Sequence, residues 1–113
     1  MSPEEIKQRL LQQRYFIKYG EVRPANFSCC NLRGVDFSNL TLYLVDFSGA
    51  DLEGAKFNYS DLHVANFSFA NLQGVDFTKA LCFATVNFTN ANLAGVDLLY
   101  LPPNKTIHKR FYR

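Results

Sequence analysis

Large apolar residues recur at every fifth position along most of this chain. The series runs without a break for fifty residues and resumes after a slip of one residue. An α-helix has a period of 3.6 and a simple strand a period of two, so neither produces a period of five. A short extended piece followed by a turn does. The central residues of these units are Phe27, Leu32, Phe37, Leu42, Phe47, Leu52, Phe57, Leu62, Phe67, Leu72, Phe77, Phe88, Leu93 and Leu98.

A mostly small residue lies two positions before each central residue, as Ala25 does before Phe27. Residues two apart in an extended piece point the same way, so both members of each pair are expected to face inward. The residue between them is usually Asn or Asp. It is expected to point outward, where its side chain can support the turn.

A longer repeat of 20 or 21 residues predicts four sides to each coil. The segments NLRGVDF, DLEGAKF, NLQGVDF and NLAGVDL follow one another at this spacing, and sorting by side places Phe on Phe and Leu on Leu. The pattern predicts an all-β solenoid of just under four coils. One corner of every coil is a glycine, as expected where the backbone needs a conformation that other residues rarely adopt: Gly34, Gly54, Gly74 and Gly95.

The motifs ANFSFANLQGVDF, GADLEGAKF and FTNANLAGVDL closely resemble the units of the pentapeptide-repeat family, A-(D/N)-L-x-x with Leu or Phe at the centre. The resemblance covers residues 25–101 and implies a right-handed quadrilateral β-helix. The segment LLQQRYFIKYGE is similar to leaders of bacterial, especially cyanobacterial, members. Some family members act through protein contacts, and others mimic duplex DNA and bind type II topoisomerases.

The chain divides into three parts: residues 1–24 as an N-terminal helical cap and entry, 25–101 as the β-helix, and 102–113 as a basic C-terminal tail. Because an open solenoid exposes unpaired backbone and apolar side chains at its ends, a capping element is expected. The tail either folds over the last coil or stays loose.

A capping α-helix is predicted over residues 2–19. Ser2 and Glu5 have the spacing of a capping box, and Pro3 suits the first turn. Gly20 follows the last helical residue, where glycine commonly ends a helix.

The slip in the repeat falls in TKALCFATV and leaves two registers open. With Cys82 central, Ala80 and Cys82 are buried while Leu81 and Phe83 face water. With Phe83 central, Leu81 and Phe83 are buried. Burying a Leu or Phe side chain is worth roughly 1.5–3 kcal/mol, which favours the register with Phe83 inward.

The residues that could carry chemistry do not form a reactive set, so the chain is predicted not to be an enzyme. His63 follows a central Leu and points outward near Asp61, without a positioned nucleophile. The outward Asn and Asp columns include Lys56 and Thr41, which favours solvated turn residues over a calcium site. Neither a cofactor nor a metal is expected.

Charge is unevenly distributed along the chain. The net charge is +2, but residues 25–101 carry seven acids against three bases, a net −4, and residues 102–113 carry four bases. Coils stacked at about 4.8 Å form a column of roughly 18 Å. Duplex DNA of that length carries on the order of ten charges, so mimicry of DNA is the alternative rather than the preferred function.

The location predicted from the sequence is the cytoplasm. No apolar run approaches the length of a transmembrane helix, and the opening MSPEEIKQRL lacks the features of a signal peptide. The three cysteines, two of them adjacent, suit a reduced compartment.

The fourth side differs from the other three, whose outward residues are mostly small or polar. Tyr43, Leu44, His63 and Val64 point outward in two stacked coils, and Tyr59 lies at the preceding corner. Such a strip has the composition of a protein interface. Alternatively, the tail or the leader helix packs there.

The predicted function is a rigid, non-catalytic interaction module with an unidentified protein partner, acting as a monomer or weak homodimer. No small-molecule substrate, direct nucleic-acid contact or membrane contact is expected. The alternative is a DNA-mimicking inhibitor, or antidote, of a topoisomerase such as gyrase.

Overall fold

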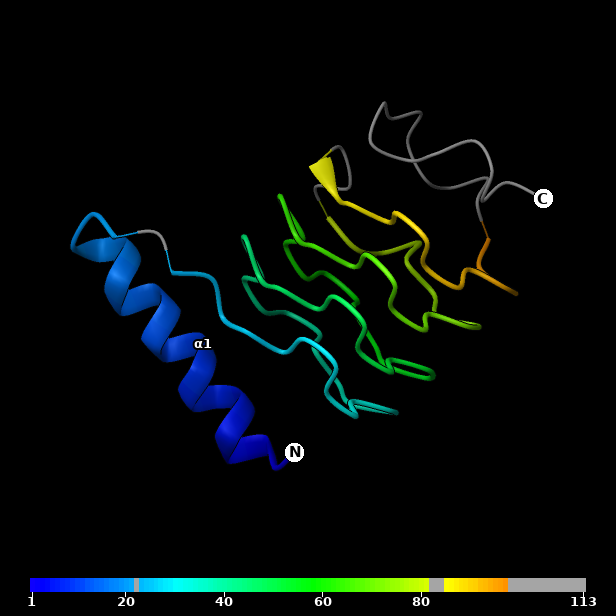
Figure 1. Cartoon of the computed structure of the whole chain (residues 1–113), viewed down its shortest axis with the longest axis horizontal. Helices are drawn as coiled ribbons and strands as arrows, with labels where there is room; N and C mark the ends of the chain where they lie inside the picture. The colour runs from blue at the N-terminus through cyan, green and yellow to red at the C-terminus, as the bar shows by residue number, and fades with distance from the viewer. Residues whose placement is uncertain (22, 82–84, 98–113) are drawn as a thin grey trace.

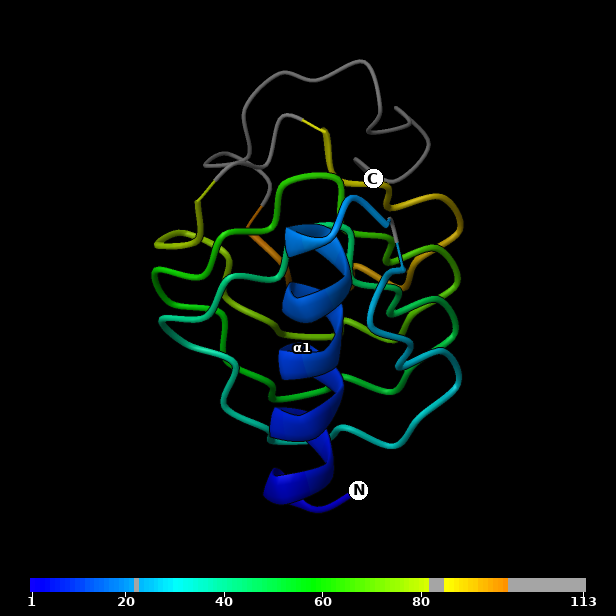
Figure 2. The ribbon, with the colours of Figure 1, turned by 90° about the vertical axis from the view of Figure 1, so that its left-hand side faces the viewer.

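The computed structural model describes residues 1–21, 23–81 and 85–97, apart from the side chains of residues 15–17. One helix, α1 (Pro3–Lys18), is followed by short extended pieces that alternate with turns. Figure 1 shows these pieces stacked in successive layers, with α1 beside one end of the stack. We define the layers as residues 25–45, 46–65, 66–86 and 87–97. Viewed from that end, α1 crosses the outline of the layers (Figure 2).

Helix α1 begins where the sequence predicts a capping box. The hydroxyl of Ser2 accepts a hydrogen bond from the backbone N–H of Glu5 at 3.2 Å and donates one to the Glu5 carboxylate at 3.3 Å. Acidic residues in the first turn and Lys18 in the last suit the helix dipole. Gly20 follows with a φ of 80°, the left-handed conformation common after a helix end. The predicted helix is therefore present, one residue shorter at each end.

Backbone hydrogen bonding explains why the repeat has a period of five. In the unit from Asp46 to Ala50, the N–H of Asp46 donates to the preceding layer, at the carbonyl of Ala25. The N–H groups of Phe47 and Gly49 donate to the following layer. The Ser48 N–H donates to the Asp46 carboxylate, and the Ala50 N–H closes the turn on the Phe47 carbonyl. All five donors of the unit are thus satisfied.

Neighbouring layers meet in isolated parallel β-bridges rather than in longer strands. Each bridge joins the outward residues that precede equivalent central positions; most of these are polar, such as Asp46 and Asn66, or Asp51 and Asn71. Each side turns a corner after two or three extended residues, which leaves room for a single bridge. The bridges run at a spacing of 20 residues through Leu81 and 21 residues from Asn87 onward.

The apolar core fills the inside of the layers, as the sequence predicts. Each described central residue from Phe27 to Leu93 is at most 8% exposed. The phenylalanine rings stack between layers, with 5.0 Å between the Phe47 and Phe67 centroids, and meet edge to face within a layer, as Phe47 and Phe57 do at 5.9 Å. Both arrangements are favourable for aromatic pairs.

Most corners of the layers have a left-handed backbone. The residue two positions after the central one has a positive φ, and the next N–H usually bonds to the central carbonyl, as in a type II turn. Glycine fills this place at the predicted corner, including Gly54 and Gly74. Other corners carry residues other than glycine, of which the asparagines adopt this conformation most readily and the bulky residues rarely: Cys29, Asn39, Leu44, Tyr59, Val64, Phe69 and Asn90.

The register preferred from the sequence at the slip is wrong for Leu81. This residue bridges Asp61, donates its N–H to the Ser60 carbonyl at 2.9 Å and is 48% exposed, while Ala80 packs against the core. Cross-layer hydrogen bonds extend the 20-residue spacing to Leu81 and hold it in an outward position. The extra residue therefore lies between Leu81 and Asn87. Cys82 and Phe83 are outside the described residues, as are Leu98 and the tail.

Polar side chains of α1 bond to the exposed edge of the first layer. Arg9 donates to the Asn26 carbonyl, and Gln13, which is only 4% exposed, accepts from the N–H of Ala25 and donates to the carbonyl of Tyr43. Ile6 belongs to the buried core cluster. The helix thus supplies partners to backbone groups that have no preceding layer to pair with.

Candidate interaction surface

The residues proposed from the sequence for partner contact lie close together on the fourth side. We name Tyr43, Leu44, Tyr59, His63 and Val64 the fourth-side strip. The rings of Tyr43 and His63 stack at 5.5 Å with an angle of 12° between their planes. Tyr59 is 56% exposed and Val64 38%, His63 is exposed, and Tyr43 and Leu44 are half-buried. The structure thus brings two rings into direct contact and leaves three further apolar residues beside them.

The backbone holds the strip in a fixed arrangement. Leu44, Tyr59 and Val64 have φ values of 63°, 59° and 59°. A left-handed backbone costs a residue other than glycine roughly 1–2 kcal/mol, and a β-branched residue such as Val64 is especially unusual there. Their side chains are aimed outward from corners that are pinned by hydrogen bonds between layers, as in the bond from the Leu44 N–H to the His63 carbonyl.

Thr85 ties the strip to the third layer. Its hydroxyl oxygen accepts a hydrogen bond from the Val64 N–H at 2.8 Å and lies 3.1 Å from Nδ1 of His63. The Asp61 carboxylate accepts from the backbone N–H of His63 and not from its ring. His63 is therefore packed between Tyr43 and Thr85, with its ring stacked on the first side chain and in contact with the hydroxyl of the second.

Sequence reasoning missed two residues of this surface, Leu81 and Thr85. Leu81 was assigned to the core, yet it is exposed on the fourth side next to Asp61. Counting in steps of 20 from Thr41 and Asp61 identifies Leu81 as outward, a signal that competed with its hydrophobicity. The predicted alternative, in which the leader helix covers the strip, has one contact in its favour, the bond from Gln13 to the Tyr43 carbonyl.

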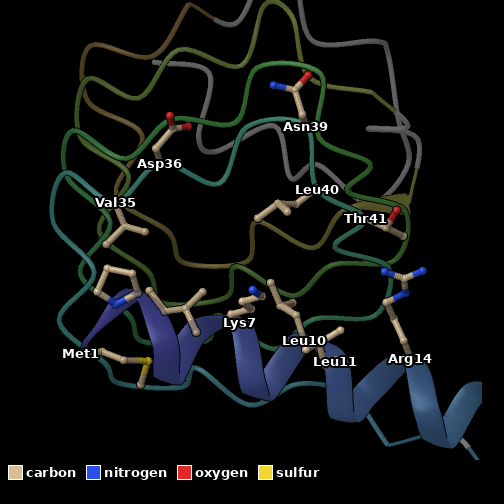
Figure 3. Close-up of a pocket in the computed structure, with 12 residues that line it drawn as sticks. Met1, Lys7, Leu10, Leu11, Arg14, Val35, Asp36, Asn39, Leu40 and Thr41 are labelled. Carbon is tan, nitrogen blue, oxygen red and sulfur yellow. The ribbon is translucent and has the colours of Figure 1, made fainter.

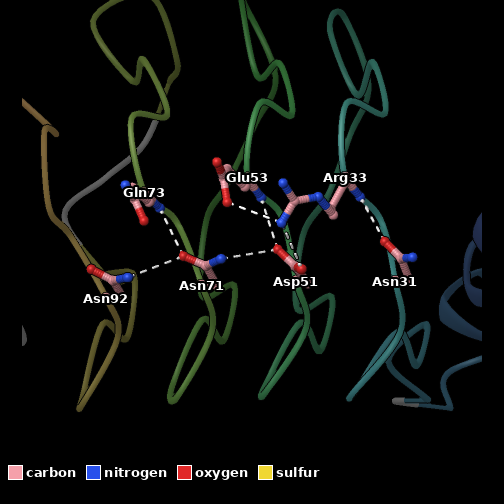
Figure 4. Close-up of polar contacts among 7 residues, drawn as sticks. All are labelled: Asn31, Arg33, Asp51, Glu53, Asn71, Gln73 and Asn92. Atoms are coloured by element: carbon pink, nitrogen blue, oxygen red, sulfur yellow. Dashed lines mark hydrogen bonds and ion pairs between the residues drawn. The ribbon is translucent and has the colours of Figure 1, made fainter.

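A polar ladder runs along the second side (Figure 4). The Asn92 amide donates to Asn71 at 3.2 Å, and the Asn71 amide donates to Asp51 at 3.0 Å. Arg33 bridges Asp51 and Glu53 at 3.1 and 3.0 Å. Burial raises the pKa of Asp51, but the hydrogen bond from Arg33 and the N–H of Glu53 lower it below its ordinary value overall. The ladder supports the turns and joins the layers.

Asparagine and aspartate side chains accept hydrogen bonds from backbone N–H groups of the turns throughout the repeat. Asp36 and Asp76 accept hydrogen bonds from the backbone N–H groups of Ser38 and Thr78. Hydrogen bonds from these partners lower the pKa of both carboxyl groups. Among the described residues, no group of three or more His, Cys, Asp or Glu side chains could hold a metal ion.

Two further features of the described residues bear on function. Cys29 is exposed and Cys30 half-buried, and both are free thiols. No helix in residues 1–21, 23–81 and 85–97 is both long and apolar enough to cross a membrane.

Comparison with known proteins shows which repeat family this chain resembles. Residues 46–81 match the family model described as pentapeptide repeats, in eight copies. A solved pentapeptide repeat protein from the Arabidopsis thaliana thylakoid lumen is 44% identical, with a TM-score of 0.60, over 63% of this chain and 48% of that one. HetL, a pentapeptide repeat protein involved in heterocyst differentiation regulation in the cyanobacterium Nostoc, is 24% identical with a TM-score of 0.40, over 66% of this chain and 47% of HetL. The chain spans about half the length of both proteins. No curated protein matches it.

The predicted cytoplasmic location is wrong, because the 44% identical protein resides in the thylakoid lumen. The prediction relied on free cysteines and on the opening residues. Cleavable targeting segments are removed from mature proteins, so the sequence of a folded repeat does not indicate the compartment in which it resides.

The comparisons indicate no catalytic family, and the proteins that match are built from the same repeat. The recurring five-residue unit, the family-model match over residues 46–81 and the solved relative together identify the repeat of this chain as that of the pentapeptide-repeat family, which implies a right-handed β-helix solenoid.

Proposed function

We propose that this chain is a non-catalytic interaction module that binds a protein partner through the fourth-side strip, extended by Leu81. The proposal takes the repeat as a quadrilateral β-helix of just under four coils with α1 as its N-terminal cap. Bridges in four columns, and the bonds from Arg9 and Gln13 to the first layer, support this arrangement.

One observation carries the proposal: bulky apolar residues occupy strained corners beside the stacked rings of Tyr43 and His63. At the equivalent corner of the second side, Gly34, Gly54 and Gly74 avoid this strain. Strained backbone conformations gather at binding sites and other functional sites, because there the side chain matters more than the local cost. Tyr59 and Val64 fit this description, since more than a third of each side chain is exposed.

A rigid surface also favours binding. Side chains fixed to a repeating backbone lose little conformational entropy when a partner docks. Exposed aromatic residues are enriched in the centres of protein interfaces, whereas lysine and glutamate are depleted there. The strip has this composition, with the Tyr43 ring stacked on His63 and the exposed Leu81 in the outward column of the same side.

The test compares partner capture by two matched variants. Tyr59→Asn copies Asn39, which lies at the same corner one layer earlier with a φ of 60°. Phe69→Asn copies Asn90 at a corner of another side and removes a ring that is 66% exposed. Neither change disturbs the backbone. Each variant is immobilised and incubated with an extract of the source cell. The Phe69→Asn variant should retain the partner, and the Tyr59→Asn variant should lose it.

Equal capture by both variants would place binding on another side. The same variants, examined by analytical ultracentrifugation over a range of concentrations, show whether the partner is a second copy. The alternative function is tested with purified gyrase: inhibition of supercoiling that survives Tyr59→Asn would contradict an interaction module centred on the strip.

A further inference from the structure

A groove lies between α1 and the first layer, separate from the fourth-side strip. Its volume is about 690 Å³. Figure 3 shows the side chains of the helix directed toward the layer across this space. Most of its lining is aliphatic, with a cation in the middle and another near one end. The groove residues used here are Ile6, Lys7, Leu10, Leu11 and Arg14 of α1, and Val35, Asp36, Leu40 and Thr41 of the first layer.

The apolar lining of the groove is incompletely covered. Leu11 is 45% exposed and Leu40 36%, although the residue equivalent to Leu40 in the next layer, Ser60, is fully buried. The helix contacts the first layer through Arg9 and Gln13 on the opposite flank of the groove, at Asn26 and Tyr43. Because α1 is held on that flank, Val35 on the third side and Leu40 on the fourth stay open to the groove.

The two ends of the groove differ in charge. Lys7 and Arg14 are seven residues apart, which is about 10 Å along the helix axis. Figure 3 shows Arg14 reaching toward Thr41 at one end, while Asp36 lies nearer the other. Within the part of the chain that the structure describes, Arg14 forms no ion pair. An anionic group is therefore favoured at the Arg14 end and disfavoured near Asp36.

We propose that the groove between α1 and the first layer binds a free long-chain carboxylic acid. Its carboxylate pairs with Arg14 and the hydroxyl of Thr41, and its alkyl chain lies along Leu11 and Leu40 toward Ile6. Ligand sites of this size are mostly apolar with a few polar groups that fix orientation.

A peptide fits the groove less well than an alkyl chain. An extended peptide needs a row of backbone partners, and each side of the layer turns a corner after two or three extended residues. An alkyl chain needs no hydrogen bonds along its length, and it would cover Leu11 and Leu40 without leaving a polar group unpaired.

The experiment titrates the full chain with cis-parinaric acid, a fluorescent long-chain carboxylic acid, below its micellar concentration. We expect saturable binding of one molecule per chain. Arg14→Gln should weaken binding roughly tenfold, the size typical for loss of a hydrogen bond to a charged group. Lys79→Gln removes an exposed cation from a distant layer and should change nothing.

Two further measurements separate the contributions of head group and chain. Binding of a long-chain alcohol of equal length, measured by displacement, should be the same for Arg14→Gln and the unchanged protein. Leu11→Asp should abolish binding of both ligands, with circular dichroism as the check that the helix persists.

Three results would overturn the proposal. Absence of saturable binding is the first. The second is equal loss of acid and alcohol binding in Arg14→Gln. The third is that the chain does not bind the monomeric acid but instead binds vesicles of anionic phospholipid, or forms a dimer that Leu11→Asp abolishes.

Discussion

Replacing Leu81 with Asn tests the register of the fourth side. Leu81 lies in the outward column that also contains Thr41 and Asp61, and its side chain is about half exposed. Asn or Asp fills the equivalent position in most units of the repeat, so Asn suits the backbone at this place. Leu62, which belongs to the same side one layer earlier, is fully buried and serves as the matched control.

The two registers differ by a measurable free energy. Full burial of a Leu side chain is worth roughly 1.5–3 kcal/mol, so losing the buried half of Leu81 costs about 1 kcal/mol. A core Leu changed to Asn loses about 2–5 kcal/mol by truncation and buries an unpaired amide for about 1–3 kcal/mol more. Leu81→Asn should therefore cost about 1 kcal/mol, and Leu62→Asn at least about 3 kcal/mol.

Urea denaturation followed by circular dichroism measures both values. For a chain of this size, 1 kcal/mol corresponds to a change in Tm of about 4 °C, so thermal melts provide a second reading. Similar losses in the two variants would refute the outward placement of Leu81. If Leu62→Asn does not fold, Leu62→Ala replaces it, with an expected cost of about 2–5 kcal/mol.

Three other predictions follow from the corners, the core and the carboxylates. Gly74→Ala should destabilise by about 1 kcal/mol in urea denaturation, because the added Cβ meets nothing within 4 Å and only the left-handed backbone, with a φ of 70°, opposes it; an unchanged midpoint would contradict this reasoning. Phe57→Ala should cost about 3–5 kcal/mol and Phe69→Ala under about 1 kcal/mol, since the first ring is fully buried and the second 66% exposed; equal costs would exclude the stacked core. Urea midpoints should be constant near neutral pH and fall below about pH 4, because groups with a lowered pKa stabilise the fold only while they are ionised; midpoints that stay level down to pH 3 would contradict the contribution of Asp36, Asp51 and Asp76.

The repeat itself was predictable because burial and turn chemistry give the same answer at each unit. A central Phe47 or Leu52 is enclosed by layers on both sides, and the Asn or Asp before it supplies the acceptor that the turn requires. The glycine corner was predictable for the same reason, since the φ of Gly54 is 76°.

The register at the slip was not predictable from hydrophobicity alone. Leu81 is as apolar as a core residue, but its bridge to Asp61 and its backbone hydrogen bonds with Ser60 and Leu62 hold it outward. Leu40, which occupies the same small inward position in the first layer, is itself 36% exposed. Position within the stack, which the sequence does not mark, decides how deeply such a residue is buried.

The candidate surface was predictable in part. Outward positions on the fourth side follow from counting, and the contact between Tyr43 and His63 follows from the spacing of layers. The left-handed conformation of Tyr59 and Val64 was not expected, because bulky residues rarely adopt it. The hydroxyl of Thr85, which bonds beside His63, lies after the slip and could not be aligned from sequence.

Site-specific photo-crosslinking tests the central claim, that the fourth side contacts a protein partner, most directly. A photoreactive phenylalanine replaces Tyr59 in one variant and Phe69 in another, two exposed aromatic corner residues on different sides of the stack. Irradiation in an extract of the source cell should yield a discrete crosslinked product from position 59, identifiable by mass spectrometry, and none from position 69. Crosslinking from position 69 alone, or equally from both, would contradict a binding surface on the fourth side.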